Sequence, residues 1–361
     1  MKTQSKLIII LLLFPALLIA NDGKLDGKYT KEKTINKEYN VNADDGLKVS
    51  NSYGNIDIVT WNENRTVIEV VIRTNGNDEE KVQQRLDEIT VDFTANSSLV
   101  TAKTIFKNKK KSWSWWGNSS KKVSVEVNYT IKIPVTNSVD LNNNYGAISL
   151  NKLKGNAKIN CDYGQIIIGE LLADNNYLNF DYTTKSTIEY MKSGKINADY
   201  SGFTIDKAER LDINADYTNS EILEVTQLNY NCDYGKVIIG NVNSVIGNGD
   251  YVNNRIGTVT GELDLNTDYG SIKVNNLSSS FKNAKINGSY TNIKLGFDSN
   301  LNFDFNFNLS YASFNGDDLV TIKHSTKDYK DKKYSGYHGV ENSGNTINVR
   351  TTYGGITLIK N

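Results

Sequence analysis

The chain of 361 residues has room for roughly two or three ordinary domains, or for one long array of repeats. Its 41 basic and 41 acidic side chains cancel, so the molecule has no overall positive field that would attract nucleic acid. Hydrophobic residues make up only 38% of the chain while tyrosine occurs 21 times, which argues against a large globular core and favours an elongated molecule.

The first twenty residues predict export. Lys2 and Lys6 open the chain, an apolar stretch runs from Leu7 to Leu18, and Ala20 offers a small residue for cleavage. The stretch is short for a membrane span, and no cysteine follows it for lipid attachment. We expect a signal peptide at 1–20 and a mature protein that is periplasmic, on the outer surface or secreted, with no transmembrane span. A retained membrane anchor is the alternative.

A leader segment at 21–45 and a β-rich N-terminal cap at 46–134 are expected next. Residues 78–88 predict the one helix, because the start is acidic and Val82, Leu86 and Ile89 share a face. Pro134, the only proline of the mature chain, marks the boundary with the repeats. The cap strands, recognised by alternating apolar residues, are expected at 47–50, 56–61, 67–73, 89–93, 100–106 and 123–133.

Beyond the cap, the sequence repeats a pattern in which asparagine stands three positions before tyrosine. The tyrosines recur at intervals of 17 to 21 residues, a regularity that local composition does not produce. The ten tyrosines are Tyr145, Tyr163, Tyr182, Tyr200, Tyr217, Tyr234, Tyr251, Tyr269, Tyr290 and Tyr311. The ten asparagines are Asn142, Asn160, Asn179, Asn197, Asn214, Asn231, Asn248, Asn266, Asn287 and Asn308.

Two further columns accompany this repeat. Aspartate directly precedes seven consecutive tyrosines: Asp162, Asp181, Asp199, Asp216, Asp233, Asp250 and Asp268. An apolar residue stands four positions before most tyrosines: Leu141, Ile159, Leu178, Ile196, Ile213, Tyr230, Leu265, Ile286 and Phe307. Because strand side chains alternate between faces, the apolar column and the repeat tyrosines are expected to share one face. This favours tyrosine packing in the core or at a corner over an exposed aromatic strip that binds carbohydrate.

A second short strand follows each tyrosine, with apolar residues three and five positions later, such as Ile166 and Ile168. The chain must therefore turn directly after the tyrosine. Several residues at this corner are Thr or Val, for example Val252, and these resist positive φ. We expect a bend between extended segments rather than a tight left-handed turn.

The columns predict an all-β fold, a single-chain β-solenoid of about 18 residues per coil and ten or more coils. The coils are assigned to 135–316. Residues 317–345 are expected to be an inserted loop or disrupted coil, and 346–361 a terminal coil that carries Tyr353. Cys161 and Cys232 occupy the same position in well-separated coils, so they are expected to be free, buried thiols.

The aspartate column is a candidate calcium site, the one cofactor that the sequence suggests. Carboxylates one strand spacing apart repel one another unless cations bridge them, and asparagine carbonyls nearby offer further oxygen ligands. The alternative is structural and is favoured here. Each aspartate then bonds the backbone of the following corner, and the asparagine and tyrosine columns form ladders that fix the register.

A lysine- and tryptophan-rich segment at 107–122 is the candidate ligand-binding site. Tryptophan beside lysine in a loop suits an anionic surface, a glycan or a membrane interface. The alternative is a hairpin tip whose indole rings fold back on the cap. The candidate residues are Trp113, Trp115, Trp116, Lys109, Lys110 and Lys111.

Catalytic chemistry finds little support in the sequence. The two histidines, His324 and His338, lie in or near the 317–345 segment, and no metal-binding Cys or His spacing is present. No nucleophile-elbow or phosphate-binding glycine motif occurs either. A β-helical polysaccharide lyase is a remote alternative, because repeats without long insertions offer little from which to build a catalytic cleft.

The run from Asn51 to Ile58 (NSYGNIDI), Trp61 and the helix-bearing strand set resemble adhesin-like proteins of the Bacteroidetes, similar to the DUF4097 and auto-transporter adhesin head (GIN) families. The resemblance covers the chain from about residue 45 onward. It implies an exported β-helical protein with an adhesin role and brings no catalytic residue. We therefore expect a non-enzymatic surface-binding protein whose partner is an envelope or surface polysaccharide or another surface protein. A structural or envelope-stress scaffold without a specific ligand is the alternative.

Overall fold

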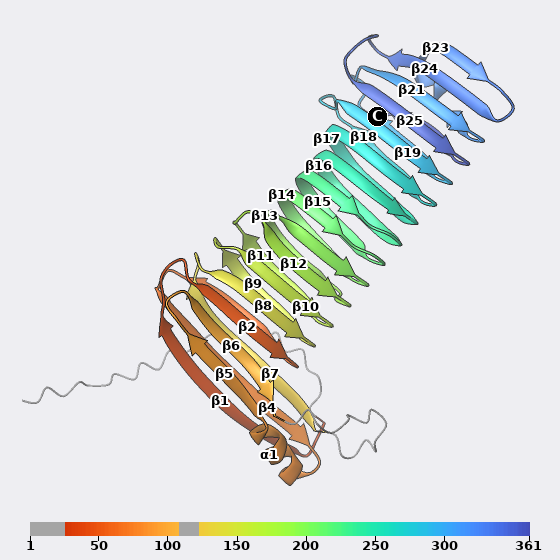
Figure 1. Cartoon of the computed structure of the whole chain (residues 1–361). Helices are drawn as coiled ribbons and strands as arrows, with labels where there is room; N and C mark the ends of the chain where they lie inside the picture. Colours follow the sequence, from red (N-terminus) through yellow and green to blue (C-terminus); the bar gives the residue numbers. More distant parts are fainter. Residues whose placement is uncertain (1–25, 108–122) are drawn as a thin grey trace, which may run out of the picture.

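A computed structural model describes residues 26–107 and 123–361. The expected signal peptide and all six candidate residues of the Trp–Lys segment lie outside these ranges. Within the described residues the protein is all-β, with 26 strands and one α-helix. The strands join into one large hydrogen-bonded network that runs the length of an elongated molecule (Figure 1).

The elements of the N-terminal region are β1 (Tyr29–Asn40), β2 (Gly46–Ser52), β3 (Ile56–Trp61), β4 (Arg65–Gly76), α1 (Glu79–Asp87), β5 (Ile89–Ala95), β6 (Leu99–Phe106) and β7 (Ser124–Pro134). The helix expected at 78–88 is confirmed as α1. Asp78 caps its start by accepting a hydrogen bond from the backbone N–H of Lys81. Val82 and Leu86 are buried where the helix contacts β1 and β4.

The central region continues with β8 (Ser138–Asn144), β9 (Ala147–Leu153), β10 (Ala157–Asp162), β11 (Gln165–Leu171), β12 (Asn176–Asp181), β13 (Ser186–Asp199), β14 (Gly202–Asn214), β15 (Asn219–Asn231), β16 (Gly235–Asp250), β17 (Val252–Asp268), β18 (Ser271–Leu277), β19 (Asn283–Ser289) and β20 (Asn292–Phe297). The C-terminal region holds β21 (Phe303–Ser310), β22 (Ser313–Asn315), a 3-10 turn at Asp317–Leu319, β23 (Thr321–Lys327), β24 (Asp331–His338), β25 (Thr346–Thr352) and β26 (Gly355–Lys360).

Each sequence repeat forms one layer of the stack. A layer has a first arm, which ends just before the repeat tyrosine, and a second arm, which follows it. First arms pair in parallel with first arms, as β10 does with β8 and β12, and second arms with second arms, as β11 does with β9 and β13. The pairing keeps the sequence columns in register, so that Asn160 lies opposite both Asn142 and Asn179.

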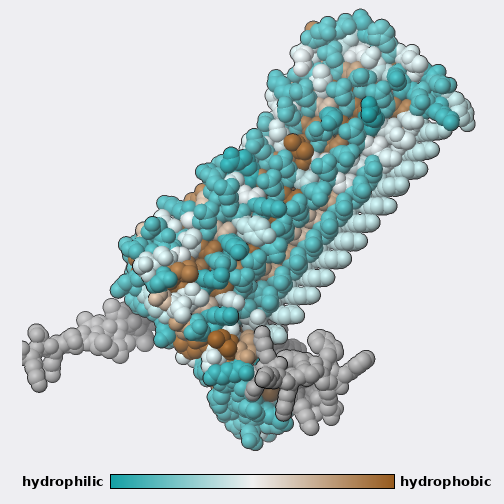
Figure 2. Space-filling view, in the orientation of Figure 1, coloured by the Kyte–Doolittle hydropathy of each residue, from teal (hydrophilic) through white to brown (hydrophobic). Residues whose placement is uncertain are grey.

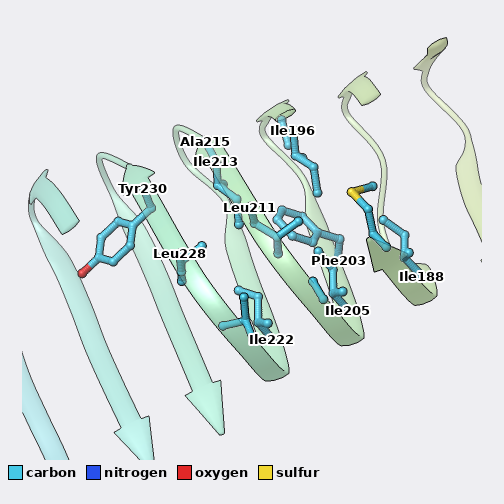
Figure 3. Close-up of a cluster of buried hydrophobic side chains, with 14 of the residues drawn as sticks. Ile188, Ile196, Phe203, Ile205, Leu211, Ile213, Ala215, Ile222, Leu228 and Tyr230 are labelled. Carbon is cyan, nitrogen blue, oxygen red and sulfur yellow. The ribbon is translucent and has the colours of Figure 1, made fainter. Parts of the chain in front are cut away.

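The hydrophobic core lies between the two arms and runs from layer to layer. Figure 3 shows part of it, with Phe203 and Ile205 from one arm and Leu211 and Ile213 from the other, all buried. Most of the apolar column is therefore in the core, as the alternation predicts. Tyr230 also belongs to this core, and its ring occupies the space beside Gly247, where a Cβ would lie 2.0 Å from Cζ of the ring.

The N-terminal end of the stack is closed by antiparallel strands. β2 and β3 form a first layer that pairs with β8 and β9, and β7 pairs in parallel with β3. Beyond them β4 pairs antiparallel with β7, β1 with β4, and β5 with β6. Strand β1 lies in the segment that was expected to be a leader. The sequence does not predict this strand, because it carries many charged residues and none of its residues is fully buried.

The C-terminal end differs from the expected order of coils. The segment 317–345 contains an antiparallel hairpin of β23 and β24, and β24 pairs antiparallel with β21. The layer that is last in sequence, β25–β26, inserts between β19–β20 on one side and β21–β22 on the other. Tyr353 therefore belongs to a layer inside the stack, because the chain turns back through the hairpin before its last two strands form.

Candidate functional site

A row of tyrosines along one edge of the stack is the most regular surface feature of the molecule. Twelve of them adopt the left-handed backbone conformation, with φ between 49° and 64°, a region that a side-chain-bearing residue rarely occupies. They are Tyr53, Tyr145, Tyr163, Tyr182, Tyr200, Tyr217, Tyr234, Tyr251, Tyr269, Tyr290, Tyr353 and Tyr311, in their order along the stack.

Two expectations about the corner are wrong for the same physical reason. The left-handed residue is the tyrosine itself rather than the Thr, Val or Gly that follows it, so the corner is a tight left-handed turn. This conformation takes the tyrosine out of the alternation of the first arm and turns its side chain away from the core. The ten repeat tyrosines are consequently 44% to 52% exposed instead of packing with the apolar column.

Threonine fits at the position after the tyrosine because its hydroxyl bonds the backbone of the corner. The side chain of Thr218 points inward and is buried, and its hydroxyl oxygen lies 2.9 Å from the backbone carbonyl oxygens of both Ala198 and Asp216, which share its one proton. The Thr291 hydroxyl makes the equivalent pair of contacts in a later layer, to the backbone carbonyl oxygens of Thr267 and Ser289. These bonds satisfy backbone acceptors at a turn that leaves the strand ladder.

The tyrosine rings stack nearly parallel to one another along the whole edge. Consecutive ring centroids are 4.8 to 5.3 Å apart, and the ring planes are within 13° of parallel. The stack also has a neighbour at each end: Phe106 packs against Tyr53 in a T-shaped arrangement, and the Lys330 ammonium lies 5.8 Å from the Tyr311 ring centroid. Ring faces are therefore largely covered by neighbours, and ring edges are what the stack presents to solvent. Figure 2 shows a row of projecting side chains along one long edge of the molecule.

The aspartate column runs beside these tyrosines and forms a ladder from layer to layer. In Asp181, Asp199, Asp216 and Asp233, one carboxylate oxygen (Oδ1) accepts a hydrogen bond from the backbone N–H of the next aspartate, at 2.8 to 3.1 Å. Asp268 binds the N–H of Ser289 in the same way. The carboxylates thus bond the backbone of the next layer rather than their own corner. Each bond engages one oxygen of a group that has a second oxygen and several lone pairs.

The asparagine column forms a ladder only in places. Asn160 donates to the amide oxygen of Asn142, and Asn214 donates to that of Asn197, at 2.9 and 3.2 Å. Asn197 instead donates to the Tyr177 hydroxyl at 2.8 Å. The asparagines therefore add register contacts on the outer face of the first arms without a continuous chain of amide bonds.

The crowding of like groups at this edge affects the pKa of two of its tyrosines and one of its aspartates. Burial by the neighbouring rings raises the pKa of Tyr163 and Tyr234, and adjacent tyrosines and aspartates raise it further. Burial, followed by the charge of Asp181, also raises the pKa of Asp162. The edge places a row of phenol hydroxyls, which donate as well as accept hydrogen bonds, beside a row of carboxylates, which accept them.

The other candidate residues lie apart from this edge. Cys161 and Cys232 are free and buried as expected, and burial raises the pKa of each thiol to about 12. His338 is buried in the C-terminal region, with Nδ1 2.7 Å from the carbonyl oxygen of Leu301, whereas His324 is exposed on β23. Across residues 26–107 and 123–361, no cluster of three or more His, Cys, Asp or Glu side chains is arranged to hold a metal ion. Calcium on the aspartate column stays a prediction.

Two members of the tyrosine row match the sequence repeat only in part, and the sequence predicts one of them, Tyr353, in the terminal coil. Tyr53 and Tyr353 lack the asparagine three positions earlier, where Ser50 and Arg350 stand instead. Both are nevertheless followed by glycine and then by an alternating apolar strand, the signal that identifies Tyr145 and Tyr163 as well. That second-arm pattern therefore also identifies Tyr53 as a member of the row.

Comparisons with known proteins leave the family open. No family model matches the chain, and no curated protein matches it either. Similar solved structures include a "putative cell adhesion protein" from Clostridium sporogenes (11% identity, TM-score 0.20, 92% of this chain and 100% of that chain). A "putative adhesin" from Bacteroides fragilis has 10% identity and a TM-score of 0.31, over 91% of this chain and 97% of that one.

A "putative lipid binding protein" from Parabacteroides distasonis has 8% identity and a TM-score of 0.28, over 90% of this chain and 96% of that chain. At such TM-scores these likenesses carry no argument about function. The resemblance to the DUF4097 and GIN families therefore stays a prediction. Among the residues that the structure describes, no helix has the length and apolar character that crossing a membrane requires.

Proposed function

We propose that this protein is an exported, non-enzymatic, adhesin-like β-solenoid that binds a surface through its tyrosine edge. The observation that carries the proposal is the row of twelve exposed, stacked tyrosines on one edge. With layers about 4.8 Å apart, the row is roughly 55 Å long. An exposed aromatic strip of this length is typical of an interaction site rather than of ordinary protein surface.

The backbone supports the same proposal. A left-handed residue with a side chain costs about 1–2 kcal/mol relative to the right-handed conformation. Glycine would remove that cost, yet all twelve positions carry tyrosine. Stacking with two neighbours offsets the cost, at about 0.5–1.5 kcal/mol per ring pair. The tyrosine hydroxyls add nothing to that stacking, so a role at the exposed edge accounts for tyrosine in preference to phenylalanine.

The alternative is a scaffold without a specific ligand. The stacking of the rings favours this alternative, because each ring contacts the tyrosines of the neighbouring layers and so helps to hold these layers in register. The two functions differ in what happens when the exposed edge is altered but the fold is retained. The Trp–Lys segment is a second proposed contact, tested by replacing Trp113, Trp115 and Trp116 with Ala.

The test measures attachment of labelled mature protein to bacterial envelope material and to cells. The variant Tyr200→Asn/Tyr217→Asn/Tyr234→Asn removes three central rings while placing a residue that tolerates the left-handed conformation. Tyr190→Asn is the matched control, because Tyr190 lies on β13 and its hydroxyl donates to Glu209 instead of joining the row. Loss of attachment in the triple variant alone supports the proposal. Full attachment of both the triple variant and the tryptophan variant would favour the scaffold.

A further inference from the structure

We propose that the tyrosine edge binds a neutral, linear β-1,4-linked glycan that lies along the stack, one sugar per layer. This inference rests on the proposed function and names its ligand class. It follows from three properties of the edge: its period, the orientation of its rings and the charge of the row beside it.

The period restricts the ligand. A partner that contacts many layers at once must repeat at the ring spacing of 4.8 to 5.3 Å. A fully extended β-1,4-linked glycan is a straight ribbon that advances about one β-strand spacing per sugar. Chains with α-1,4 or β-1,3 linkages coil and lose this match. An extended polypeptide advances by only about 3.3 Å per residue, so it falls out of phase within a few layers.

The orientation of the rings determines how such a glycan is held. Sugar rings commonly pack on the open face of an aromatic ring, but here ring faces are covered by the neighbouring tyrosines. The exposed atoms are ring edges and hydroxyls. The contact is therefore a row of hydrogen bonds to sugar hydroxyls, one phenol for each sugar, rather than a stacking platform.

The aspartate row complements a polyhydroxyl ligand. Its carboxylates accept hydrogen bonds from sugar hydroxyls, while the neutral phenols donate as well as accept. Seven carboxylates in one row repel a polyanion, so uronic acid polymers and nucleic acids are disfavoured even where their spacing suits. Hydrogen bonds repeated over many layers make the affinity depend on the length of the glycan.

The experiment measures binding of the full mature chain to cellulose and chitin, and to soluble cello- and chito-oligosaccharides from disaccharide to hexasaccharide. Starch, a β-1,3-glucan and a β-1,4-linked polyuronate serve as comparison ligands. We expect binding only to the neutral β-1,4-linked glycans, with an affinity that rises steadily with chain length.

Two variants test whether the edge is responsible. Tyr200→Phe/Tyr217→Phe/Tyr234→Phe keeps the stacked rings but removes three hydroxyls. It should weaken hexasaccharide binding by about two- to tenfold, because every stretch of six layers then lacks at least one hydroxyl. Tyr190→Phe, which removes a hydroxyl that donates to Glu209 away from the row, should leave it unchanged. Thermal unfolding of both variants checks that the fold is retained.

Equal binding to glycans of every linkage, or full binding by the triple Phe variant, overturns the inference. If no β-1,4-linked glycan binds but the triple Asn variant still loses attachment to envelope material, the inference fails and the proposed function stands. If the triple Asn variant keeps full attachment, the proposed function fails. A dimer seen by sedimentation, without glycan binding and lost in the triple Phe variant, would assign the edge to a second copy of the chain and overturn the inference.

Discussion

The central layers and the two ends of the stack pair the backbone hydrogen-bonding groups of their strands in opposite ways. In the centre, parallel in-register pairing passes every backbone hydrogen bond on to the next layer, as in β14, β15 and β16. At the ends, antiparallel strands take over, with β4 and β1 at one end and β24 and β23 at the other (Figure 1). A parallel stack has no natural stop, so its open edges would pair with further strands.

The end strands carry the charges that discourage such pairing. Strand β1 carries both Lys and Glu side chains, and Lys31 forms a 2.6 Å ion pair with Glu79 of helix α1. Strand β23 carries Lys323 and Lys327 and is almost fully exposed. The central layers thus supply repetition and a regular edge, whereas the ends supply termination.

The largest expected effect comes from placing a charge in the layer that is last in sequence but inside the stack. Val349→Asp buries a carboxylate at a position that is 2% exposed, and should destabilise the protein by about 4 kcal/mol or more. Because β25 lies between β19 and β21, hydrogen exchange should show lost protection in 303–338 as well as in 346–361. Ile322→Asp on the outermost strand β23 is the control and should cost about 1 kcal/mol. Lost protection confined to 346–361 would contradict the inserted order.

A cavity in a central layer should cost more than the same deletion at an end. Phe180 is fully buried and meets the ring of Phe203 edge-on, with centroids 5.5 Å apart. Phe180→Ala should lower the free energy of unfolding by about 3–4 kcal/mol. Phe93→Ala, on the half-buried end strand β5, should cost less than about 2 kcal/mol. Urea unfolding of both variants makes the comparison, and equal losses would refute the difference in packing between the regions.

Alkaline pH should weaken both regions through buried acids. Burial raises the pKa of Cys161 and Cys232 in the centre, and of Tyr129 in the cap, to about 12. Since the folded pKa is above the unfolded one, the stabilisation is complete below the unfolded pKa and is lost as pH rises toward 12. The loss is about 1.4 kcal/mol per pH unit for each group that is ionised only in the unfolded chain.

Urea unfolding at about pH 8 and about pH 10.5 checks this dependence, with the slope given by the groups above. Cys161→Ala removes one of the groups and should flatten the decline by one group's share, whatever its effect at neutral pH. A stability that stays constant over this interval would show that the thiols ionise as easily in the folded protein as in the unfolded chain.

The smallest effect separates backbone strain from ring stacking at a single layer. Tyr217→Ala keeps the left-handed strain and loses two ring contacts, so it should cost about 1–3 kcal/mol. Tyr217→Gly loses the same contacts but removes the strain, and should cost less by about 1 kcal/mol. Tyr217→Phe should change stability by less than about 0.5 kcal/mol. Thermal unfolding measures the series, and an alanine variant as stable as the phenylalanine variant would deny the rings a role in holding the layers.

The sequence by itself determined the period of the stack, most of the core column, the helix α1 and the burial of both cysteines. These features depend on the alternation of side chains along a strand and on the number of residues that one layer takes. Both are local properties of the sequence. The cap strands from 46 to 134 follow for the same reason. The columns also placed the asparagines and aspartates on the outer face.

Only the tertiary structure decided where the tyrosines point and which layer ends the stack. The left-handed conformation of Tyr217 persists because the rings of Tyr200 and Tyr234 stack on it, contacts that a single repeat does not contain. The position of Tyr353 between Tyr290 and Tyr311 depends on the hairpin β23–β24, which carries the chain back before its last layer forms. Both outcomes arise from contacts between distant segments, whereas the alternation of residues along one strand specifies only the faces of that strand.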